Sequence, residues 1–382
     1  MFRVALRLGM TSFGGPVAHI GYFRDEYVTR RRWLGDEQFG EIVALAHLLP
    51  GPSSSQVGIV IGMHRAGKLG GLAAWFGFTL PSAVALTALA LWARGADLEN
   101  AGWVQGLELA AAAVVASAVI GMRKALARGP VRLALAAAAA AAALLVPGSP
   151  GQAATILVAG AIGGLVFRRP RAALPLTLRF PIGHRTAVTA AVAFCALLVG
   201  LPVVAGLGSS HLVDLTEAFY RAGALVFGGG HVVLPLLDDA VVGTGWVSQQ
   251  AFLAGYGVTQ AVPGPLFTFS AYLGAIGEPA PNGVAGAAIA LGAIFLPSFL
   301  LLGAVLPLWS AVRERVVVQA AVAGISAAVV GLLAAALWDP VLRTSVHGVG
   351  EALFAVALFG LLRIAPPWMV VAIAAAAGEA VF

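Results

Sequence analysis

Two short motifs near the start of this 382-residue chain combine residue types that can hold an anion. The first, Phe13-Gly14-Gly15-Pro16, has Arg7 before it and His19 after it. The second is Pro50-Gly51-Pro52, which Ser53 follows. Arginine and serine donate hydrogen bonds, and a helix that begins after a Gly/Pro break exposes unpaired N–H groups and about half a positive charge. These residues therefore suggest the binding of an oxyanion.

Both motifs recur in the same order later in the chain. Arg7 matches Arg221 at an offset of 221 − 7 = 214 residues, and Phe227-Gly228-Gly229-Gly230 with His231 follows. Pro263-Gly264-Pro265 matches the Pro-Gly-Pro run, and Leu296-Pro297-Ser298 matches Leu80-Pro81-Ser82. An ordered set of matches predicts an internal repeat. We expect a first repeat over residues 1–180, a linker with one extra transmembrane helix over 181–209, and a second repeat over 210–382.

The predicted site lies where the broken helices of the two repeats meet. We expect backbone N–H groups after Gly15, Gly51, Gly229 and Gly264 to hold the anion, with charge from Arg7 or Arg221. The predicted substrate-binding residues are Arg7, Phe13, Gly14, Gly15, Pro50, Gly51, Pro52, Ser53, Arg221, Phe227, Gly228, Gly229, Gly230, His231, Pro263, Gly264 and Pro265.

Each charged or titratable candidate also has a structural interpretation. Arg7 can extend to the membrane surface, and Arg221 can pair with Glu217 one turn earlier. Ser53 can satisfy freed carbonyl groups of the broken helix instead of an anion. The candidates for proton coupling are His19, Glu41 and His231, because imidazole titrates near neutrality and a carboxyl group inside a membrane is costly.

The elements that must position these residues are membrane helices. The chain is 60% hydrophobic and only 10% charged, whereas soluble domains average about 25% charged residues. Apolar runs of roughly 20 residues, enough to cross a bilayer, recur along the sequence. The net charge of +6 comes from short loops between these runs, so we expect no nucleic-acid partner. The single cysteine, Cys195, excludes a disulfide and is expected to pack inside a helix.

The distribution of Lys and Arg predicts how the repeats are oriented. Basic loops are enriched on the cytoplasmic side, and here they cover residues 24–32, 64–68, 123–132 and 168–185. All four share one side only if the Pro-Gly-Pro run enters and leaves the membrane on that side as a re-entrant hairpin. The first apolar run, about residues 2–21, is interpreted as a second hairpin, although a spanning helix is the alternative.

In the second repeat the loops over residues 238–250 and 277–283 contain no Lys or Arg. This reversal predicts an all-α polytopic membrane protein of two inverted repeats, each with broken Phe-Gly-Gly and Pro-Gly-Pro segments between spanning helices. Two parallel repeats are the alternative. The N-terminus is expected to lie in the cytoplasm.

On these residues the chain resembles the chromate ion transporter family, in its two-domain bacterial type. The resemblance rests on Phe13-Gly14-Gly15-Pro16 with His19, on Phe227-Gly228-Gly229-Gly230-His231, and on both Pro-Gly-Pro runs. It implies export of chromate for resistance across the bacterial inner membrane, with sulfate as a competitor and protons as the coupling ion. Uptake of sulfate or another oxyanion is the alternative, because the donors would hold either dianion.

An enzyme is the competing class of function. Glu37 and Glu41 followed by Ser53-Ser54-Ser55 are similar to the motifs of undecaprenyl-pyrophosphate phosphatases. The second repeat lacks both carboxylates and the serine run, so we predict a transporter with no catalytic residue, metal site or cofactor. The expected partners are the oxyanion, protons and the lipid bilayer, and the sequence leaves a homodimer open.

Overall fold

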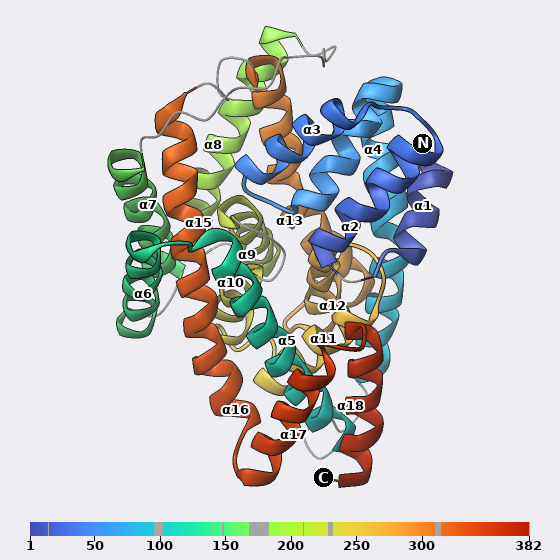
Figure 1. The fold of residues 1–382 in the computed structure, drawn as a ribbon, viewed down its shortest axis with the longest axis vertical. Helices are drawn as coiled ribbons and strands as arrows, with labels where there is room; N and C mark the ends of the chain where they lie inside the picture. The colour runs from blue at the N-terminus through green and yellow to red at the C-terminus, as the bar shows by residue number, and fades with distance from the viewer. Residues whose placement is uncertain are drawn as a thin grey trace.

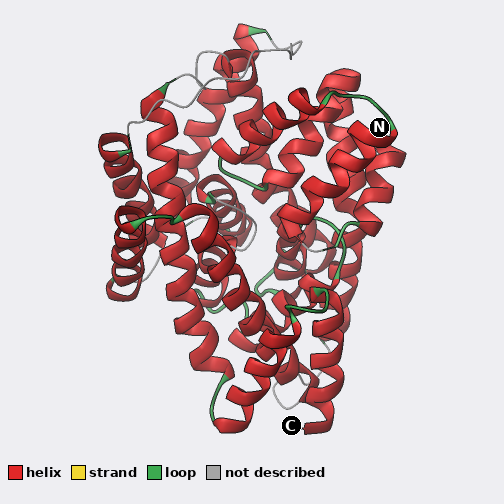
Figure 2. Cartoon of the chain, in the orientation of Figure 1, coloured by secondary structure: helices red, strands yellow, loops and turns green. Residues whose placement is uncertain are grey.

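The protein is a bundle of helices. A computed structural model describes residues 1–13, 15–94, 102–146, 149–167, 183–208, 210–227, 232–309 and 315–381, and their regular structure is entirely helical (Figures 1 and 2). Five helical segments are long and apolar enough to cross a membrane: Ser53–Ala93, Gly102–Lys124, His184–Gly206, Gly283–Leu308 and Val316–Ser345. The predicted class, an all-α polytopic membrane protein, is confirmed.

The first apolar run is broken into two helices at the Phe-Gly-Gly motif. Helix α1 (Phe2–Thr11) ends at Ser12, whose backbone is extended (φ −88°, ψ 96°). Helix α2 (Gly15–Phe23) begins at a glycine with φ of +76°, a conformation that a side chain would disfavour. The π-helical segment η1 (Arg24–Arg30) follows and forms most of the basic stretch over residues 24–32 that was expected as a loop.

The Pro-Gly-Pro motif breaks the next run in the same way. Helix α3 (Asp36–Leu48) precedes it, and α4 (Ser53–Ala93) follows it with Pro52 as the N-cap residue. Helix α4 is itself broken at Ala66 and Gly67, and Gly67 has φ of +65°. It therefore consists of a short helix over residues 53–65 and a longer one over residues 68–93.

The remaining helices follow in two groups. Between residues 102 and 206 they are α5 (Gly102–Leu126), α6 (Pro130–Leu145), α7 (Ser149–Val166) and α8 (His184–Gly206). From residue 211 they are α9 (His211–Leu225), α10 (Val233–Leu237), η3 (Asp238–Val242), α11 (Gln249–Ala261), η4 (Leu266–Thr268), α12 (Phe269–Ile276), α13 (Gly283–Val305), η5 (Leu306–Leu308), α15 (Val316–Ala336), η6 (Leu337–Leu342), α16 (Arg343–Ser345), α17 (Val349–Leu361) and α18 (Pro367–Val381).

Several helical elements after residue 210 follow similar elements of the first part of the chain at the same sequence offset as the repeated motifs. Helices α3 and α11 each have 13 residues, and their starts at Asp36 and Gln249 are 249 − 36 = 213 positions apart. The π-helical segments η1 and η3 begin at Arg24 and Asp238, which are 238 − 24 = 214 apart. Because π-helical segments are rare, their matched placement is a structural likeness that sequence pattern alone did not indicate.

Close packing of matched helices depends on matched glycines. A Cβ at Gly9 of α1 would lie 2.6 Å from the Phe78 carbonyl oxygen of α4. A Cβ at Gly223 of α9 would lie closer still to the Ile294 carbonyl oxygen of α13. Small residues permit such backbone approach between membrane helices. Helix α1 thus packs on α4 as α9 packs on α13.

The helices after α4 and after α13 exchange partners. Gly106 of α5 packs against Ala374 and Gly378 of α18, whereas Gly163 of α7 packs against Ala320 and Gly324 of α15. Figure 1 shows α6 and α7 beside α15 at one edge of the bundle, and α17 and α18 beside α5. Helices α17 and α18 therefore pack on α5, and α6 and α7 pack on α15.

The ends of each Pro-Gly-Pro segment lie close together. Arg65, at the end of the first short helix of α4, stacks on Trp33 just before α3, with its guanidinium carbon 5.3 Å from the ring centroid. At the second motif, the Glu278 N–H donates to the Trp246 carbonyl oxygen (3.0 Å), which joins the end of α12 to the start of α11. Trp33 and Trp246 are again 246 − 33 = 213 residues apart.

One expectation about packing is wrong. Cys195, which we expected inside a packed helix, is exposed on the surface of α8. Only Ala187 is buried along the described length of α8, so this apolar helix lies at the outside of the bundle, where a membrane protein contacts lipid.

Candidate anion site

The two Pro-Gly-Pro turns are held by backbone hydrogen bonds to the opposite part of the chain. The Gly51 N–H donates to the carbonyl oxygen of Val226, directly before Phe227 (2.7 Å). The Gly264 N–H donates to the carbonyl oxygen of Ser12, directly before Phe13 (3.0 Å). Each Pro-Gly-Pro turn therefore lies against the break that begins at the other Phe-Gly-Gly motif.

Both turns need glycine for the same two reasons. Gly51 has φ of +114° and Gly264 has φ of +111°, where an L side chain is strained. A Cβ at Gly264 would lie 2.7 Å from Ser82 Oγ, and a Cβ at Gly51 would lie closer still to Ser298 Oγ. The two serines are the last residues of the matched Leu-Pro-Ser motifs. Each turn is therefore packed against a serine from the opposite part of the chain.

Gln56 holds the first Pro-Gly-Pro turn in place, and the sequence analysis did not predict it as a site residue. Its Nε2 donates to the Pro50 carbonyl oxygen (2.6 Å) and lies 3.3 Å from Ser298 Oγ. The side chain is completely buried, and its Oε1 has no hydrogen-bond partner among the described residues. An acceptor left without a donor in a buried site is costly, so this oxygen marks a place where a further polar group fits.

Two short helices begin at these turns with free donors. Helix α4 begins at Ser53 and η4 begins at Leu266, and neither has a side-chain cap. The first backbone N–H groups of a helix have no acceptor within the helix, and they carry a partial positive charge. Ser53, Ser54 and Ser55 are all buried, so the first turn of α4 offers backbone and hydroxyl donors away from bulk water.

His19 connects the first Phe-Gly-Gly break to the start of α4. Its Nδ1 lies 3.2 Å from Ser54 Oγ, and its ring lies near the Ser12 backbone. The ring is fully buried between Phe23 and Phe78, and its Nε2 has no hydrogen-bond partner among the described residues. His19, which was predicted as a proton-coupling residue, therefore lies between the Ser12 backbone and the start of α4.

Arg221 pairs with Glu217, which is the structural interpretation that the sequence analysis gave for it. Its guanidinium forms a two-pronged ion pair with Glu217, with Nε 2.7 Å from Oε1 and Nη2 3.3 Å from Oε2. Glu217 is buried, and the Arg221 side chain is 26% exposed. A charge paired this way is available to an anion only if the anion shares the guanidinium or displaces the carboxylate.

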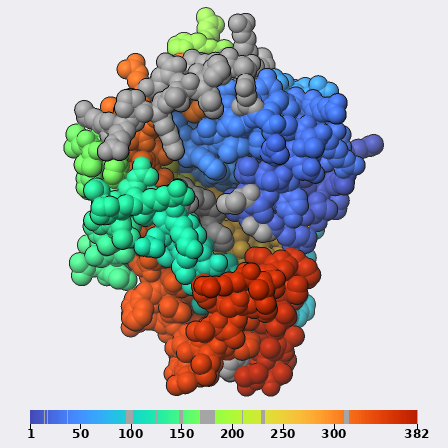
Figure 3. Space-filling model, viewed as in Figure 1, coloured from blue at the N-terminus to red at the C-terminus, as the bar shows by residue number. Residues whose placement is uncertain are grey.

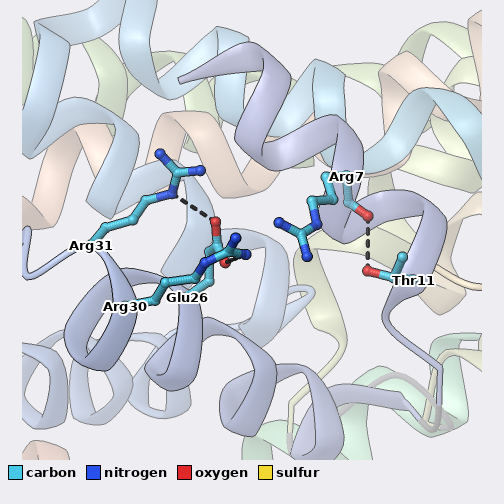
Figure 4. A network of polar contacts seen from close by, with 5 residues as sticks. All are labelled: Arg7, Thr11, Glu26, Arg30 and Arg31. Carbon is cyan, nitrogen blue, oxygen red and sulfur yellow. Dashed lines mark hydrogen bonds and ion pairs between the residues drawn. The ribbon is translucent and has the colours of Figure 1, made fainter.

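Arg7 does not lie in the buried centre. It is exposed on α1, and Figure 4 shows its guanidinium turned toward Glu26 of η1. Glu26 forms ion pairs with Arg31 (2.6 Å) and Arg30 (3.2 Å). Burial alone would raise the pKa of Glu26. The hydrogen bond and charge of Arg31, together with Arg30, outweigh this effect and hold the pKa below its usual value. This cluster is a positively charged surface near the start of the chain.

The other predicted residues are buried, partly exposed, or outside the described part of the chain. Pro50, Pro52, Pro265 and Glu41 are buried, while Pro263, Phe227, Gly15 and Phe13 are partly exposed, and Phe13 packs on Trp368 of α18 (centroids 6.1 Å apart). Gly14, Gly228, Gly229, Gly230 and His231 lie outside the described residues.

Sequence reasoning missed Glu108 on α5. Its side chain is buried inside a spanning helix, and the residues three, four and seven positions later, Ala111, Ala112 and Val115, belong to the core cluster that contains Val226 and Val232. Glu108 thus lies on a face of α5 that packs into the core of the bundle. The signal was available, because a carboxyl group inside an apolar run marks a functional candidate.

The fold and the site together define a multi-pass membrane protein with paired broken helices around a buried polar centre. The family profile described as "Chromate transporter" matches residues 1–165 and again residues 213–379. The chain belongs to the chromate transporter family.

Several curated proteins are similar over most of the chain. A chromate transport protein of Pseudomonas aeruginosa is 30% identical over 89% of this chain and 80% of its own length. A probable chromate transport protein of Synechococcus elongatus is 28% identical over 98% and 93%. A chromate transport protein of Cupriavidus metallidurans is 28% identical over 94% and 86%. No solved structure matches the fold.

Proposed function

We propose that this protein is a secondary transporter that moves chromate, and sulfate as its isosteric competitor, across the bacterial plasma membrane. Export of chromate as a means of resistance is the direction that we favour. The reciprocal bonding of the Pro-Gly-Pro turns carries this proposal: Gly51 bonds to Val226, and Gly264 bonds to Ser12. Four broken helix ends are thereby gathered at one buried centre, as in transporters that bind a substrate near the midplane.

We further propose that the two halves, residues 1–180 and 210–382, are inverted repeats and that both Pro-Gly-Pro segments are re-entrant. In support, each segment enters and leaves at one face, at Trp33 with Arg65 and at Trp246 with Glu278. The two faces are separated by the helix over residues 68–93, which is about 39 Å long at 1.5 Å per residue. Its far end, Arg94, pairs with Glu278 (3.1 Å), whereas its near end follows Arg65.

The polar centre suits a tetrahedral dianion. Backbone N–H groups and the buried hydroxyls at the start of α4 donate without carrying charge, and Arg221 lies at the matched position of the second half. Each charge-assisted hydrogen bond contributes about 1.5–3 kcal/mol, so several of them offset the loss of the anion's hydration. Such donors bind chromate and sulfate through the same oxygen geometry. Alternating access then comes from one half rocking against the other.

Flux of chromate into proteoliposomes tests the function. Purified protein is reconstituted, and uptake of chromate is measured with and without a pH gradient and with sulfate as competitor. We expect saturable flux that sulfate inhibits and that a pH gradient accelerates. No saturable flux in either direction would overturn the transporter proposal. Flux that does not depend on the pH gradient would exclude only the coupling of transport to protons.

A matched pair of variants tests the site. Gln56→Leu removes the donor to Pro50 and the buried polar group beside Gly51, whereas Gln250→Leu changes an exposed glutamine of α11. We expect Gln56→Leu to lower chromate flux at least about 10-fold, the loss of one buried hydrogen bond. Equal flux in the two variants, in folded protein, would place the anion elsewhere.

A further inference from the structure

A cavity of about 610 Å³ lies apart from the buried centre, where four helices end. Its lining comes from the α5–α6 connection at Arg128, the start of α6 at Val131 and Arg132, the end of α7 at Phe167, and the first turns of α15 at Gln319 and Ala323. The packing of α6 and α7 on α15 forms this edge of the bundle, which Figure 3 shows in green and teal. The cavity is large enough for a small organic ligand.

The lining is positively charged. Arg128 and Arg132 both line the cavity, and no carboxylate among the described residues forms an ion pair with either. Arg132 is held over the ring of Phe167, with its guanidinium carbon 5.1 Å from the ring centroid, and this contact fixes its direction. The Nε of Arg128 donates to the Lys124 carbonyl oxygen, and among the described residues no acceptor is assigned to its two terminal nitrogens.

The position of the cavity along the helices places it at a membrane surface. Helix α5 ends at Leu126, α6 begins at Pro130, α7 ends at Val166 and α15 begins at Val316. These ends meet at the cavity, and helices that cross a bilayer end at its surface. Arg123 and Lys124 in the last turn of α5 add further positive charge there. Such an excess of basic residues is typical of the cytoplasmic surface, where anionic lipids attract it.

We propose that this cavity binds the phosphate group of an anionic membrane phospholipid. The two guanidinium groups pair with phosphate oxygens, which arginine recognises in a two-pronged geometry. The apolar side chains of Val131 and Ala323 then contact the part of the lipid nearest its acyl chains. A free inorganic phosphate shares the same chemistry, but it leaves most of a 610 Å³ cavity unfilled.

Retention of lipid by the purified protein tests the proposal. The wild-type chain and Arg128→Gln/Arg132→Gln are purified in mild detergent, supplied with phosphatidylglycerol, and examined by native mass spectrometry. Because one basic residue near an anionic lipid changes binding about fivefold, the double variant should retain about 25-fold less phosphatidylglycerol. Phosphatidylcholine, whose headgroup has no net charge, should bind weakly to both.

Matched variants separate this site from a general surface effect. Arg363→Gln removes an arginine that also stacks on a ring, Phe359, but lies away from the cavity. It should retain lipid as the wild type does, whereas Arg132→Gln alone should lose about fivefold. Ala323→Phe fills the cavity without a change of charge and should also reduce retention. Thermal unfolding of each variant confirms that the protein is folded.

Three results would overturn the proposal. Equal loss in Arg132→Gln and Arg363→Gln would show only a diffuse charge effect. Normal retention in Ala323→Phe would place the lipid outside the cavity. Stabilisation of the wild type by inorganic phosphate in phosphatidylcholine nanodiscs, lost in Arg132→Gln while phosphatidylglycerol has no effect, would assign the cavity to a free anion.

Discussion

Gly51 and Gly264 are the residues whose replacement should damage the centre most directly. At each, alanine would adopt a φ near +110°, which costs at least about 1–2 kcal/mol, and its Cβ would meet a serine Oγ. We expect Gly51→Ala and Gly264→Ala to lower the free energy of unfolding by about 3 kcal/mol and to abolish chromate flux. Thermal unfolding in detergent and flux in proteoliposomes measure the two effects.

Gly245→Ala is the control for these glycine variants. Gly245 also has a positive φ, +77°, but a Cβ there would meet no atom within 4 Å. It should therefore lose only the conformational part, about 1–2 kcal/mol, and keep flux. If Gly51→Ala proves no more harmful than Gly245→Ala, the close approach of the turn to Ser298 has no energetic weight.

The ion pair between Glu217 and Arg221 permits a test of whether the arginine binds the anion. If Arg221 only neutralises Glu217, then Arg221→Gln leaves a buried carboxylate unpaired, and the double variant with Glu217→Gln should recover flux. If Arg221 binds the anion, the double variant should transport as poorly as Arg221→Gln. We expect the second result, with flux reduced at least about 10-fold in both, and a double-mutant cycle on flux and unfolding measures it.

Asp238, in η3 beyond the spanning helices, should make stability depend on pH. Burial, with help from the charges of Asp239 and Asp339, raises its pKa from 3.8 to about 6, although Gln249 donates a hydrogen bond to it. A raised pKa means that its contribution to stability is complete below about pH 4 and is lost as the pH rises through about 6. Asp238→Asn should thus stabilise the protein by about 1–2 kcal/mol at pH 7.5 and leave it unchanged at pH 4. Thermal unfolding across this range checks it, and a pH-independent difference would contradict it.

Residue types indicated the broken turns but not their partners. The Pro-Gly-Pro and Phe-Gly-Gly motifs predict breaks in the helices because proline and glycine disrupt helices locally. The partners Val226, Ser12, Ser298 and Gln56 come from tertiary packing, and no local rule connects Gly51 to a residue 175 positions away, since 226 − 51 = 175. The same holds for Arg7, whose exposure depends on where α1 lies.

At the scale of elements, the packing of α9 on α13 should depend on one glycine. A Cβ at Gly223 would collide with the backbone at Ile294 of α13, whereas a Cβ at Gly292 of α13 would meet nothing within 4 Å. We expect Gly223→Leu to separate the helices and to lower the unfolding temperature by several degrees, with Gly292→Leu close to wild type. Fluorescence-detected size exclusion after heating distinguishes them. Similar melting of both variants would mean that the contact is adaptable.

Helical elements could be predicted because hydrophobic length and breaking residues are local properties. The helix starts at Gly15 and Ser53 follow directly from their motifs. The π-helical segments and the break at Ala66–Gly67 could not be predicted, since they depend on how neighbouring turns pack. The packing of α6 and α7 on α15, and of α17 and α18 on α5, could not be predicted either. The spacing of small residues indicates that helices pack closely, but it does not indicate which helix is the partner.

At the scale of the whole molecule, loop charge and geometry support the same topology. The loop with Arg30, Arg31 and Arg32 lies at the face of Trp33, and the face of Trp246 carries the loop over residues 243–248, which has no Lys or Arg. Positive loops stay in the cytoplasm, so the second hairpin should open on the outside. The ion pair between Arg94 and Glu278 brings the C-terminal end of α4 to the face of Trp246.

Labelling of single cysteines tests this inverted arrangement. In a Cys195→Ala background, Gly35→Cys reports the base of the first hairpin, while Gln250→Cys and Ala280→Cys report the base of the second; all three positions are exposed. A membrane-impermeant maleimide applied to intact cells should label the latter two and leave Gly35→Cys unlabelled until the membrane is permeabilised. Parallel repeats would place both hairpin bases on one side, so labelling of Gly35→Cys together with Gln250→Cys in intact cells would reject inversion. A shared anion centre would then need another explanation than pseudo-two-fold symmetry, because two parallel hairpins would approach it from one side.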